Sequence, residues 1–331
     1  MGSSRAATLP VAGVATSARA QRFVRRLALA CAALVLAVTS LSAYLRLSRA
    51  GLSCPDWPQC YGQSLRELQQ GRAATGGEGA ATAAARLAHR LVASGALLLV
   101  LAMLAAALTA RPILARQARV AALLLVLALC LAVLGRWSSD ARLPAVAMAN
   151  LLGGFVMLAL CWRLARHAQA SASATVRSIA ALGVALLVVQ VALGGLVSAS
   201  HAATSCTTGL ADCLSAAREV PLVALDPWRE PQLAGTPPVN PDGALLQLVH
   251  RLSGLAAAAV LAVAGLAALR GARRALGALL LAVLAATLAP GFAMAAQGPT
   301  LALALAHNVL AALLLATAFE LSRGPQRDAP A

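Results

Sequence analysis

Eight long apolar runs are the feature that most restricts how this chain can fold. Each has about twenty residues and few charges, which is the length that a helix needs to cross the hydrocarbon core of a bilayer. Of the 331 residues, 60% are hydrophobic and 11% are charged, whereas soluble domains carry roughly a quarter charged residues. The sequence predicts an all-α integral membrane protein whose eight transmembrane helices lie at about 27–44, 86–110, 120–135, 143–163, 178–198, 244–269, 275–290 and 298–321.

The arginines predict how these helices are oriented. The formal net charge is +16, but the basic residues fall in short clusters between apolar runs and form no basic face that would bind nucleic acid. The N-terminus, the turns after the second, fourth and sixth runs, and the tail hold 16 of the 27 arginines, and nine of the 11 acidic residues lie on the opposite side. Because arginine-rich short loops stay in the cytoplasm, we expect a multi-pass protein of the bacterial inner (plasma) membrane with both termini cytoplasmic.

The two halves of the chain repeat one layout. Each half has a long outer loop with two cysteines, and Leu45–Cys54 aligns with Val197–Cys206 at an offset of 152. Both halves start on the same side, so they form parallel repeats about an axis along the membrane normal. We expect two pseudo-symmetric four-helix bundles. The expected division is a disordered cytoplasmic N-terminus at 1–21, a first bundle at 22–168, a second bundle at 169–322 and a cytoplasmic tail at 323–331.

Four polar residues lie at similar depth near the outer ends of four runs. His89 and His250 each begin a His-Arg pair, and Asn150 and His307 stand about two turns into other runs. Ionisable residues at membrane depth are costly and mark functional sites, although a single histidine can also serve as a hydrogen-bonding link between helices. Because His250 and His307 belong to the same half, two neutral imidazoles on facing helices suit axial ligation of a heme iron.

The arginines that follow two of these histidines fit the same interpretation. Arg90 and Arg251 lie at the outer end, where they can pair with heme propionates or extend to the membrane interface as long basic side chains do. A zinc site is a poorer interpretation, because no third or fourth ligand stands beside His250 and His307 at tetrahedral spacing.

Two pairs of cysteines lie in the outer loops, on the oxidising side of the membrane: Cys54 with Cys60, and Cys206 with Cys213. Structural disulfides are the favoured interpretation, and a redox-active pair above a membrane cavity is the alternative. The first pair belongs to the stretch Gly51–Gly62, whose two prolines and two aromatic residues predict a rigid turn at the interface. The remaining cysteines lie within the apolar runs as small apolar residues: Cys31, Cys130 and Cys161.

The Gly51–Gly62 stretch resembles the heme A synthase family, integral membrane proteins of cytochrome oxidase assembly. Members carry a similar Gly-Leu-Ser-Cys-Pro-Asp-Trp-Pro segment after the first span. The resemblance extends over nearly the whole chain. It also includes Arg46-Leu47-Ser48, His89-Arg90, Leu134-Gly135, Leu143-Pro144, Leu151-Leu152-Gly153-Gly154, Gln190–Ser198 (QVALGGLVS), His250-Arg251 and His307-Asn308.

The resemblance implies two heme sites, one in each bundle. The second bundle would hold a heme b cofactor whose iron is bound by His250 and His307, with Arg251 beside it. The first bundle would receive heme O and oxidise its C8 methyl group to a formyl group by successive hydroxylations. The residues implied for that substrate site are His89, as ligand of the substrate iron, Asn150 and Arg90, and the implied disulfides are Cys54–Cys60 and Cys206–Cys213.

The chain departs from the family pattern at two positions of the first bundle. The family has a glutamate where Arg86 stands and a histidine where Asn150 stands. Arginine cannot act as a base and asparagine is a poor iron ligand, so the resemblance identifies no catalytic residue at the glutamate position. We expect a heme A synthase, an oxidoreductase acting on CH or CH2 groups. A catalytically degenerate protein that binds or transfers heme, and a b-type cytochrome that relays electrons, are the alternatives. The expected partners are heme O, the lipid membrane, heme O synthase, oxidase assembly factors and a second copy of the chain.

Overall fold

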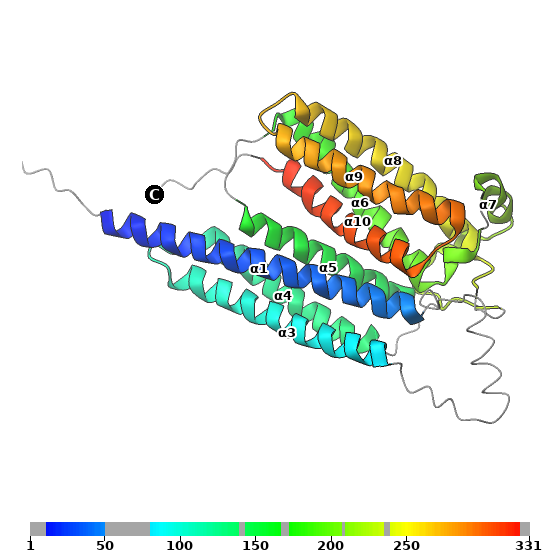
Figure 1. Ribbon diagram of the computed structural model, residues 1–331, viewed down its shortest axis with the longest axis horizontal. Helices are drawn as coiled ribbons and strands as arrows, with labels where there is room; N and C mark the ends of the chain where they lie inside the picture. The colour runs from blue at the N-terminus through cyan, green and yellow to red at the C-terminus, as the bar shows by residue number, and fades with distance from the viewer. Residues whose placement is uncertain are drawn as a thin grey trace, which may run out of the picture.

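The computed structural model describes residues 11–49, 80–138, 143–166, 172–206, 209–234 and 239–324, and Figure 1 shows that these ranges are almost entirely helical. A short helix α7 (Leu210–Ala217) and two 3-10 turns, η1 (Ala202–Thr204) and η2 (Leu222–Leu225), lie in the loop between α6 and α8. The long helices are α1 (Val11–Arg49), α3 (Ala80–Thr109), α4 (Ala115–Ser138), α5 (Pro144–Ala165), α6 (Ala174–Ala199), α8 (Gly243–Leu269), α9 (Arg274–Gln297) and α10 (Leu301–Leu321).

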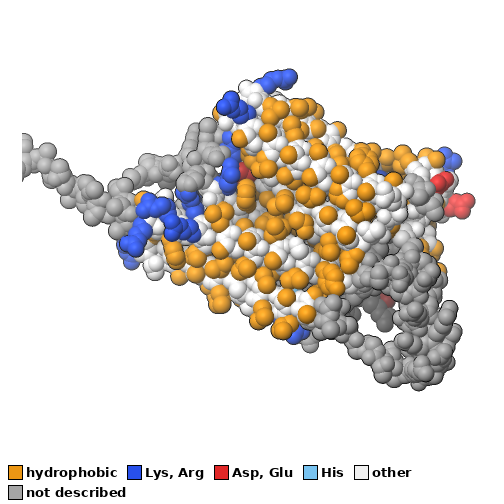
Figure 2. Space-filling view, in the orientation of Figure 1, with side chains coloured by type: hydrophobic (Ala, Val, Ile, Leu, Met, Phe, Trp, Pro, Cys, Tyr) orange, Lys and Arg blue, Asp and Glu red, His pale blue; other side chains and the backbone are white. Residues whose placement is uncertain are grey.

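Eight of the described helices are long and apolar enough to cross a membrane, which confirms the predicted all-α integral membrane fold. Their alanine and leucine content favours the helix, and a helix satisfies every backbone polar group within itself, as the bilayer interior requires. Apolar side chains cover much of the flank seen in Figure 2. Leu98 and Val126, for example, are 66% and 58% exposed, which is the arrangement expected of side chains that face lipid.

Two helix limits differ most from the expectation. α1 begins at Val11, so the segment 11–21, for which we expected disorder, is helical over its described part, as its several alanines favour. α9 continues through Pro290 to Gln297, although we expected the span to end at that proline. Proline is tolerated inside transmembrane helices where neighbouring helices satisfy backbone groups around it, and His307 of α10 contacts the carbonyl of Thr287, three residues before Pro290.

The helices form two four-helix rings. In the first, α1 and α4 each contact both α3 and α5, and in the second, α6 and α9 each contact both α8 and α10. Figure 1 shows the two bundles side by side with their axes roughly aligned. α3 and α5 therefore occupy one diagonal of the first bundle, and α8 and α10 occupy the matching diagonal of the second.

The interface between the bundles has a two-fold pattern. α1 meets both α6 and α10, and α5 meets the same two helices. Since α1 corresponds to α6 and α5 corresponds to α10 in the repeat, exchanging the halves reproduces the set of contacts. A polar contact crosses this interface, where the Nε of Arg46 in α1 donates to the Oγ of Ser198 in α6 at 2.9 Å. The described helices thus have the arrangement that the sequence repeat predicted.

The two ends of the helix array differ in charge. The arginine end holds the start of α1, the α3–α4, α5–α6 and α8–α9 connections and the end of α10, and the cysteine end holds α7 and the opposite helix termini (Figure 1). Blue side chains gather at the arginine end in Figure 2, and the red acidic side chains lie mainly at the other end. This separation agrees with the arginine pattern of the sequence.

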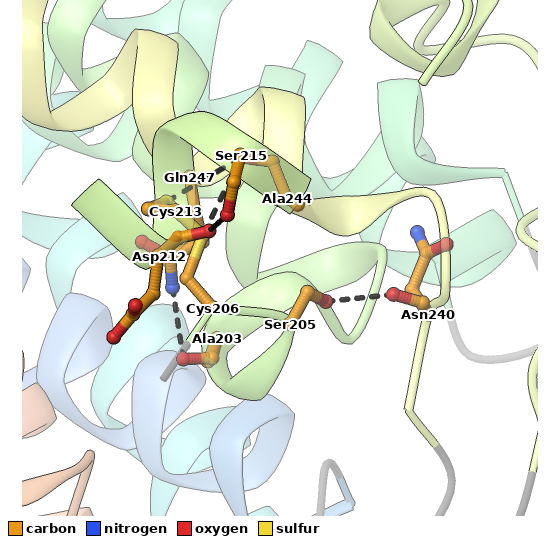
Figure 3. Close-up of a disulfide and its surroundings, with 9 residues drawn as sticks. All are labelled: Ala203, Ser205, Cys206, Asp212, Cys213, Ser215, Asn240, Ala244 and Gln247. Atoms are coloured by element: carbon orange, nitrogen blue, oxygen red, sulfur yellow. Dashed lines mark hydrogen bonds between the residues drawn. A yellow bond between two sulfur atoms is a disulfide. The ribbon is translucent and has the colours of Figure 1, made fainter. Parts of the chain in front are cut away.

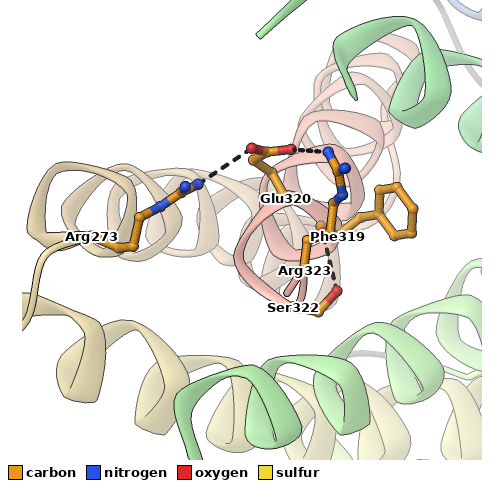
Figure 4. A network of polar contacts seen from close by, with 5 residues as sticks. All are labelled: Arg273, Phe319, Glu320, Ser322 and Arg323. Atoms are coloured by element: carbon orange, nitrogen blue, oxygen red, sulfur yellow. Dashed lines mark hydrogen bonds and ion pairs between the residues drawn. The ribbon is translucent and has the colours of Figure 1, made fainter. Parts of the chain in front are cut away.

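A buried ion-pair cluster joins α9 and α10 at the arginine end (Figure 4). Glu320 accepts from Arg273 Nη2 at 3.3 Å through Oε1 and from Arg323 Nη1 at 3.1 Å through Oε2. The side chains of Glu320 and Arg273 are only 6% and 8% exposed. Nearby, α8 and α9 cross so closely that a Cβ added to Gly277 would lie only 2.7 Å from the Gly265 carbonyl oxygen. These contacts fix α9 between α8 and α10.

Candidate functional site

The four predicted site positions lie at one level of the molecule. His89, Asn150, His250 and His307 all fall in the first three turns of α3, α5, α8 and α10. All four helices begin at the cysteine end (Figure 1). Because α8 and α10 stand on a diagonal, the structure brings His250 and His307 to opposite sides of the second bundle, and it places His89 and Asn150 in the corresponding positions of the first.

His307 is positioned by α9. Its Nδ1 lies 2.9 Å from the carbonyl oxygen of Thr287. A carbonyl can only accept, so Nδ1 carries the proton and Nε2 keeps its lone pair for a ligand. The ring packs against Gly291, where a Cβ would approach its Cε1 to 3.3 Å and its Nδ1 to 3.5 Å. α9 therefore determines both the tautomer and the place of this imidazole.

His250 is positioned by α6. The Nε2 of Gln190 donates to the His250 carbonyl oxygen at 2.9 Å and lies 3.0 Å from the His250 Nδ1 and 3.4 Å from its Nε2. Ser253, one turn further along α8, donates to the Gln190 Oε1 at 2.6 Å. A Cβ on Gly194 would approach the His250 Cε1 to 3.1 Å. The His250 ring thus lies along α6, with one amide beside both of its nitrogens.

The paired imidazoles suit a heme iron better than a bare metal ion. They stand on the diagonal helices α8 and α10, and small residues, Gly194 and Gly291, leave room for each ring. Among the described residues no group of three or more His, Cys, Asp or Glu side chains is placed to hold a metal ion. A porphyrin needs only two axial ligands from the protein because its own nitrogens supply the rest. His307 therefore offers its Nε2 to such a group, and His250 fits as the second ligand once the Gln190 amide, which lies within 3.4 Å of both of its nitrogens, releases one of them.

The first bundle has a different set of side chains at the same level. His89 and Asn150 are half-buried on α3 and α5, Arg86 is half-buried one turn before His89, and Arg90 is exposed. In the second bundle Arg251 is half-buried next to His250. Both His-Arg pairs lie near the starts of α3 and α8, which are at the cysteine end.

Sequence reasoning missed the residues that hold the two imidazoles. Gln190 had a signal, since it opens the QVALGGLVS stretch, but nothing in the stretch indicates that it contacts a residue 60 positions later. Thr287 had none, because its backbone carbonyl rather than its side chain makes the contact. Contacts between helices of this kind do not appear in hydrophobic periodicity.

The outer loop of the second half carries a disulfide. Cys206 and Cys213 are joined, with their Cα atoms 4.9 Å apart, and Figure 3 shows the bond beside the start of α8. Ser205 Oγ donates to the Asn240 carbonyl at 2.7 Å, and Gln247 Nε2 donates to the Ala203 carbonyl at 2.8 Å. These bonds hold the loop against the helix that presents His250. Cys54 and Cys60, with the rest of Gly51–Gly62, lie outside the described residues.

Comparison with known proteins decides the family. The family model described as "Cytochrome oxidase assembly protein" matches residues 25–319. A curated protein named heme A synthase from Shewanella oneidensis is 30% identical over an alignment of 311 positions, which covers 85% of this chain and 90% of that protein. The chain belongs to the heme A synthase family of cytochrome oxidase assembly proteins. Membership supports a general oxidoreductase role, and with the eight apolar helices it supports a multi-pass membrane protein.

Proposed function

We propose that this protein converts heme O to heme A by oxidising the C8 methyl group to a formyl group. In this proposal the second bundle holds heme b between His250 and His307, and the first bundle receives heme O at His89. The observation that carries the proposal is the pair of imidazoles on the diagonal helices α8 and α10, each with its own partner on a neighbouring helix. Family membership supplies the reaction class.

The residues of the second bundle would retain the cofactor. His250 and His307 ligate the iron through neutral nitrogens, and Arg251 neutralises a propionate at the cysteine end. Heme b, when bound, supplies one-electron redox chemistry. The Cys206–Cys213 disulfide secures the loop next to α8 and so supports the position of His250. The corresponding Cys54–Cys60 disulfide would do the same for the first bundle.

The first bundle would bind the substrate less tightly. His89 is the ligand to the substrate iron, Arg90 pairs with a propionate, and Asn150 is a polar neighbour on the opposite helix. Arg86 stands at the position of the family glutamate and cannot accept a proton at neutral pH. A substrate site with one strong ligand holds its heme less tightly than a site with two, so it releases the heme more readily.

The proposed setting is the bacterial inner membrane, with the arginine end and both termini in the cytoplasm. Heme O synthase would supply the substrate, and oxidase assembly factors would receive the product, with heme O and heme A remaining in the lipid phase. A homo-oligomer is compatible with the apolar flanks.

The test is expression with a heme O synthase in a host that makes no heme A, followed by extraction and mass analysis of the hemes. We expect heme A above the vector control. His89→Ala should abolish it and keep heme b, and His250→Ala or His307→Ala should remove the low-spin heme b spectrum. His201→Ala, at a histidine outside the four positions, is the control and should keep both.

The outcomes distinguish the synthase from the alternatives. Heme b retention without any heme A would refute the synthase and leave a protein that binds heme or relays electrons. The double variant Arg86→Glu with Asn150→His restores the family residues. If those two positions limit turnover, this variant makes more heme A than the wild-type chain.

A further inference from the structure

Pro290 interrupts the hydrogen bonding of α9 next to the ligand His307. A proline has no N–H, so the carbonyl of Ala286, four residues earlier, loses its usual helical donor, and a proline ring inside a helix generally bends it. Such a bend turns the preceding carbonyls away from the helix axis, and polar groups of neighbouring helices then satisfy them. The helix nevertheless continues to Gln297, so the interruption lies within a packed transmembrane segment.

The contact that α9 makes with His307 next to Pro290 comes from the α9 backbone. The Thr287 carbonyl, three residues before Pro290, lies 2.9 Å from Nδ1 of His307. The Thr287 side chain is engaged elsewhere, since its Oγ1 donates to the Val283 carbonyl at 2.7 Å. Gly291 completes the contact, because a Cβ there would come within 3.3 Å of the imidazole, a distance at which the ring has to move.

We propose that Pro290 and Gly291 are positioning residues for the iron ligand His307: Pro290 exposes the Thr287 carbonyl that holds the imidazole as its Nδ1–H tautomer, and Gly291 lets the ring approach. The inference rests on the proposed heme b site. It gives a role to a proline that lies inside a transmembrane span, where it removes a backbone hydrogen bond. A hydrogen bond to the second nitrogen of a metal-ligating histidine makes that ligand more basic and fixes its orientation.

The first bundle lacks this arrangement. Three buried positions set the register between α4 and α9 at an offset of 156: Val120, Ala121 and Leu124 in α4 match Leu276, Gly277 and Leu280 in α9. In that register Leu134 stands where α9 has Pro290, and Leu131 stands where it has Thr287. α4 therefore keeps its N–H donors at the level of Asn150. The proline beside the ligand-holding carbonyl thus belongs to the bundle that would retain its heme, and the bundle that would release its heme has a leucine there.

The test compares three α9 variants of the full chain, purified with heme b. Pro290→Ala restores an N–H, so α9 can straighten and its Gly291 N–H competes with His307 for the Thr287 carbonyl. Gly291→Ala pushes the ring away from the same oxygen. Thr287→Ala removes only the side chain and is the matched control. The readouts are transfer of heme b to an excess of apomyoglobin, the midpoint potential, and the melting temperature.

We expect Pro290→Ala and Gly291→Ala to weaken heme b binding by about 10- to 100-fold and to shift the midpoint potential to more positive values, because a less basic imidazole stabilises ferric iron less. Thr287→Ala should match the wild type. If Pro290→Ala melts no lower than the wild type and keeps wild-type affinity and potential, the inference is wrong. A wild-type chain that shows no heme b dependent on His307 would refute the proposed function and this inference with it.

Discussion

Removing the carboxylate of Glu320 should destabilise the second bundle strongly. Glu320 is 6% exposed and bridges Arg273, which is 8% exposed, and Arg323. Glu320→Ala removes the Glu320 carboxylate from the buried Arg273 guanidinium. Breaking a buried pair from one side costs about 3–5 kcal/mol, because the remaining charge stays out of water. The i, i+3 pair with Arg323 adds little, since partly exposed pairs contribute about 0.2–1 kcal/mol.

The assay is thermal unfolding in detergent. The amount of soluble monodisperse protein that remains is measured at each temperature. At about 2–4 °C per kcal/mol for a unit the size of one bundle, Glu320→Ala should lower the melting temperature by roughly 6–20 °C. Glu320→Gln keeps the shape and one accepting oxygen and isolates the contribution of the charge. Arg323→Ala removes only the more exposed partner and should shift the melting temperature by a few degrees.

One result would contradict this reasoning. If Glu320→Ala and Arg323→Ala melt at the same temperature, Arg273 gains no more from the carboxylate than a surface arginine would. The argument from burial would then fail. Raising the salt concentration provides a further check, because a buried pair is screened much less than an exposed one.

Three further predictions concern the cysteine end. Gln190→Leu should destabilise the ligand-free protein by about 1–3 kcal/mol, seen as a lower melting temperature, since the His250 carbonyl and the Ser253 hydroxyl lose their amide partner; an unchanged melting temperature would contradict this. Cys213→Ser opens a short loop and should cost about 2–3 kcal/mol locally, measured as faster hydrogen exchange over α7 with little change in α4. Burial lowers the pKa of His201 below its ordinary value, so the folded state disfavours the proton. Neutral His201 therefore contributes fully to stability above about pH 6.5, and this contribution is lost as the pH falls through the lowered folded-state pKa. Hydrogen exchange of residues 199–206 should show this pH dependence, and His201→Gln should remove it.

The membrane fold could be predicted from the sequence because the bilayer imposes a simple rule on length and composition. The eight apolar runs correspond to eight helices, and the places of His89, Asn150, His250 and His307 near the outer ends of their runs predict that they lie at one level. The first and last residues of the helices were less predictable. Pro290 was expected to end a span, but a proline's effect depends on whether a neighbouring helix satisfies the freed carbonyls, which is a property of the packing.

The groups that contact His250 and His307 could not be predicted from the sequence, because they too depend on how the helices pack. Gln190 lies 60 residues from His250, and Thr287 contributes a carbonyl that every residue type has. Cys31 and Cys161 were expected to be small apolar residues, and the fold brings their sulfur atoms to 3.5 Å across α1 and α5. The buried pair of Arg273 and Glu320 was also unforeseen, since each residue alone resembles an ordinary helix terminus.

The hydrogen bond between Arg46 and Ser198 has a consequence for the history of the chain. Position 46 plus the repeat offset of 152 is position 198, so each residue touches its own counterpart in the other half. Contact between equivalent positions occurs only beside the pseudo-two-fold axis. In a dimer of identical halves the same position would face itself, and two arginines there would repel each other. Joining both halves in one polypeptide removes that restriction, because the duplicated position can keep arginine on one side and become its hydrogen-bonding partner on the other.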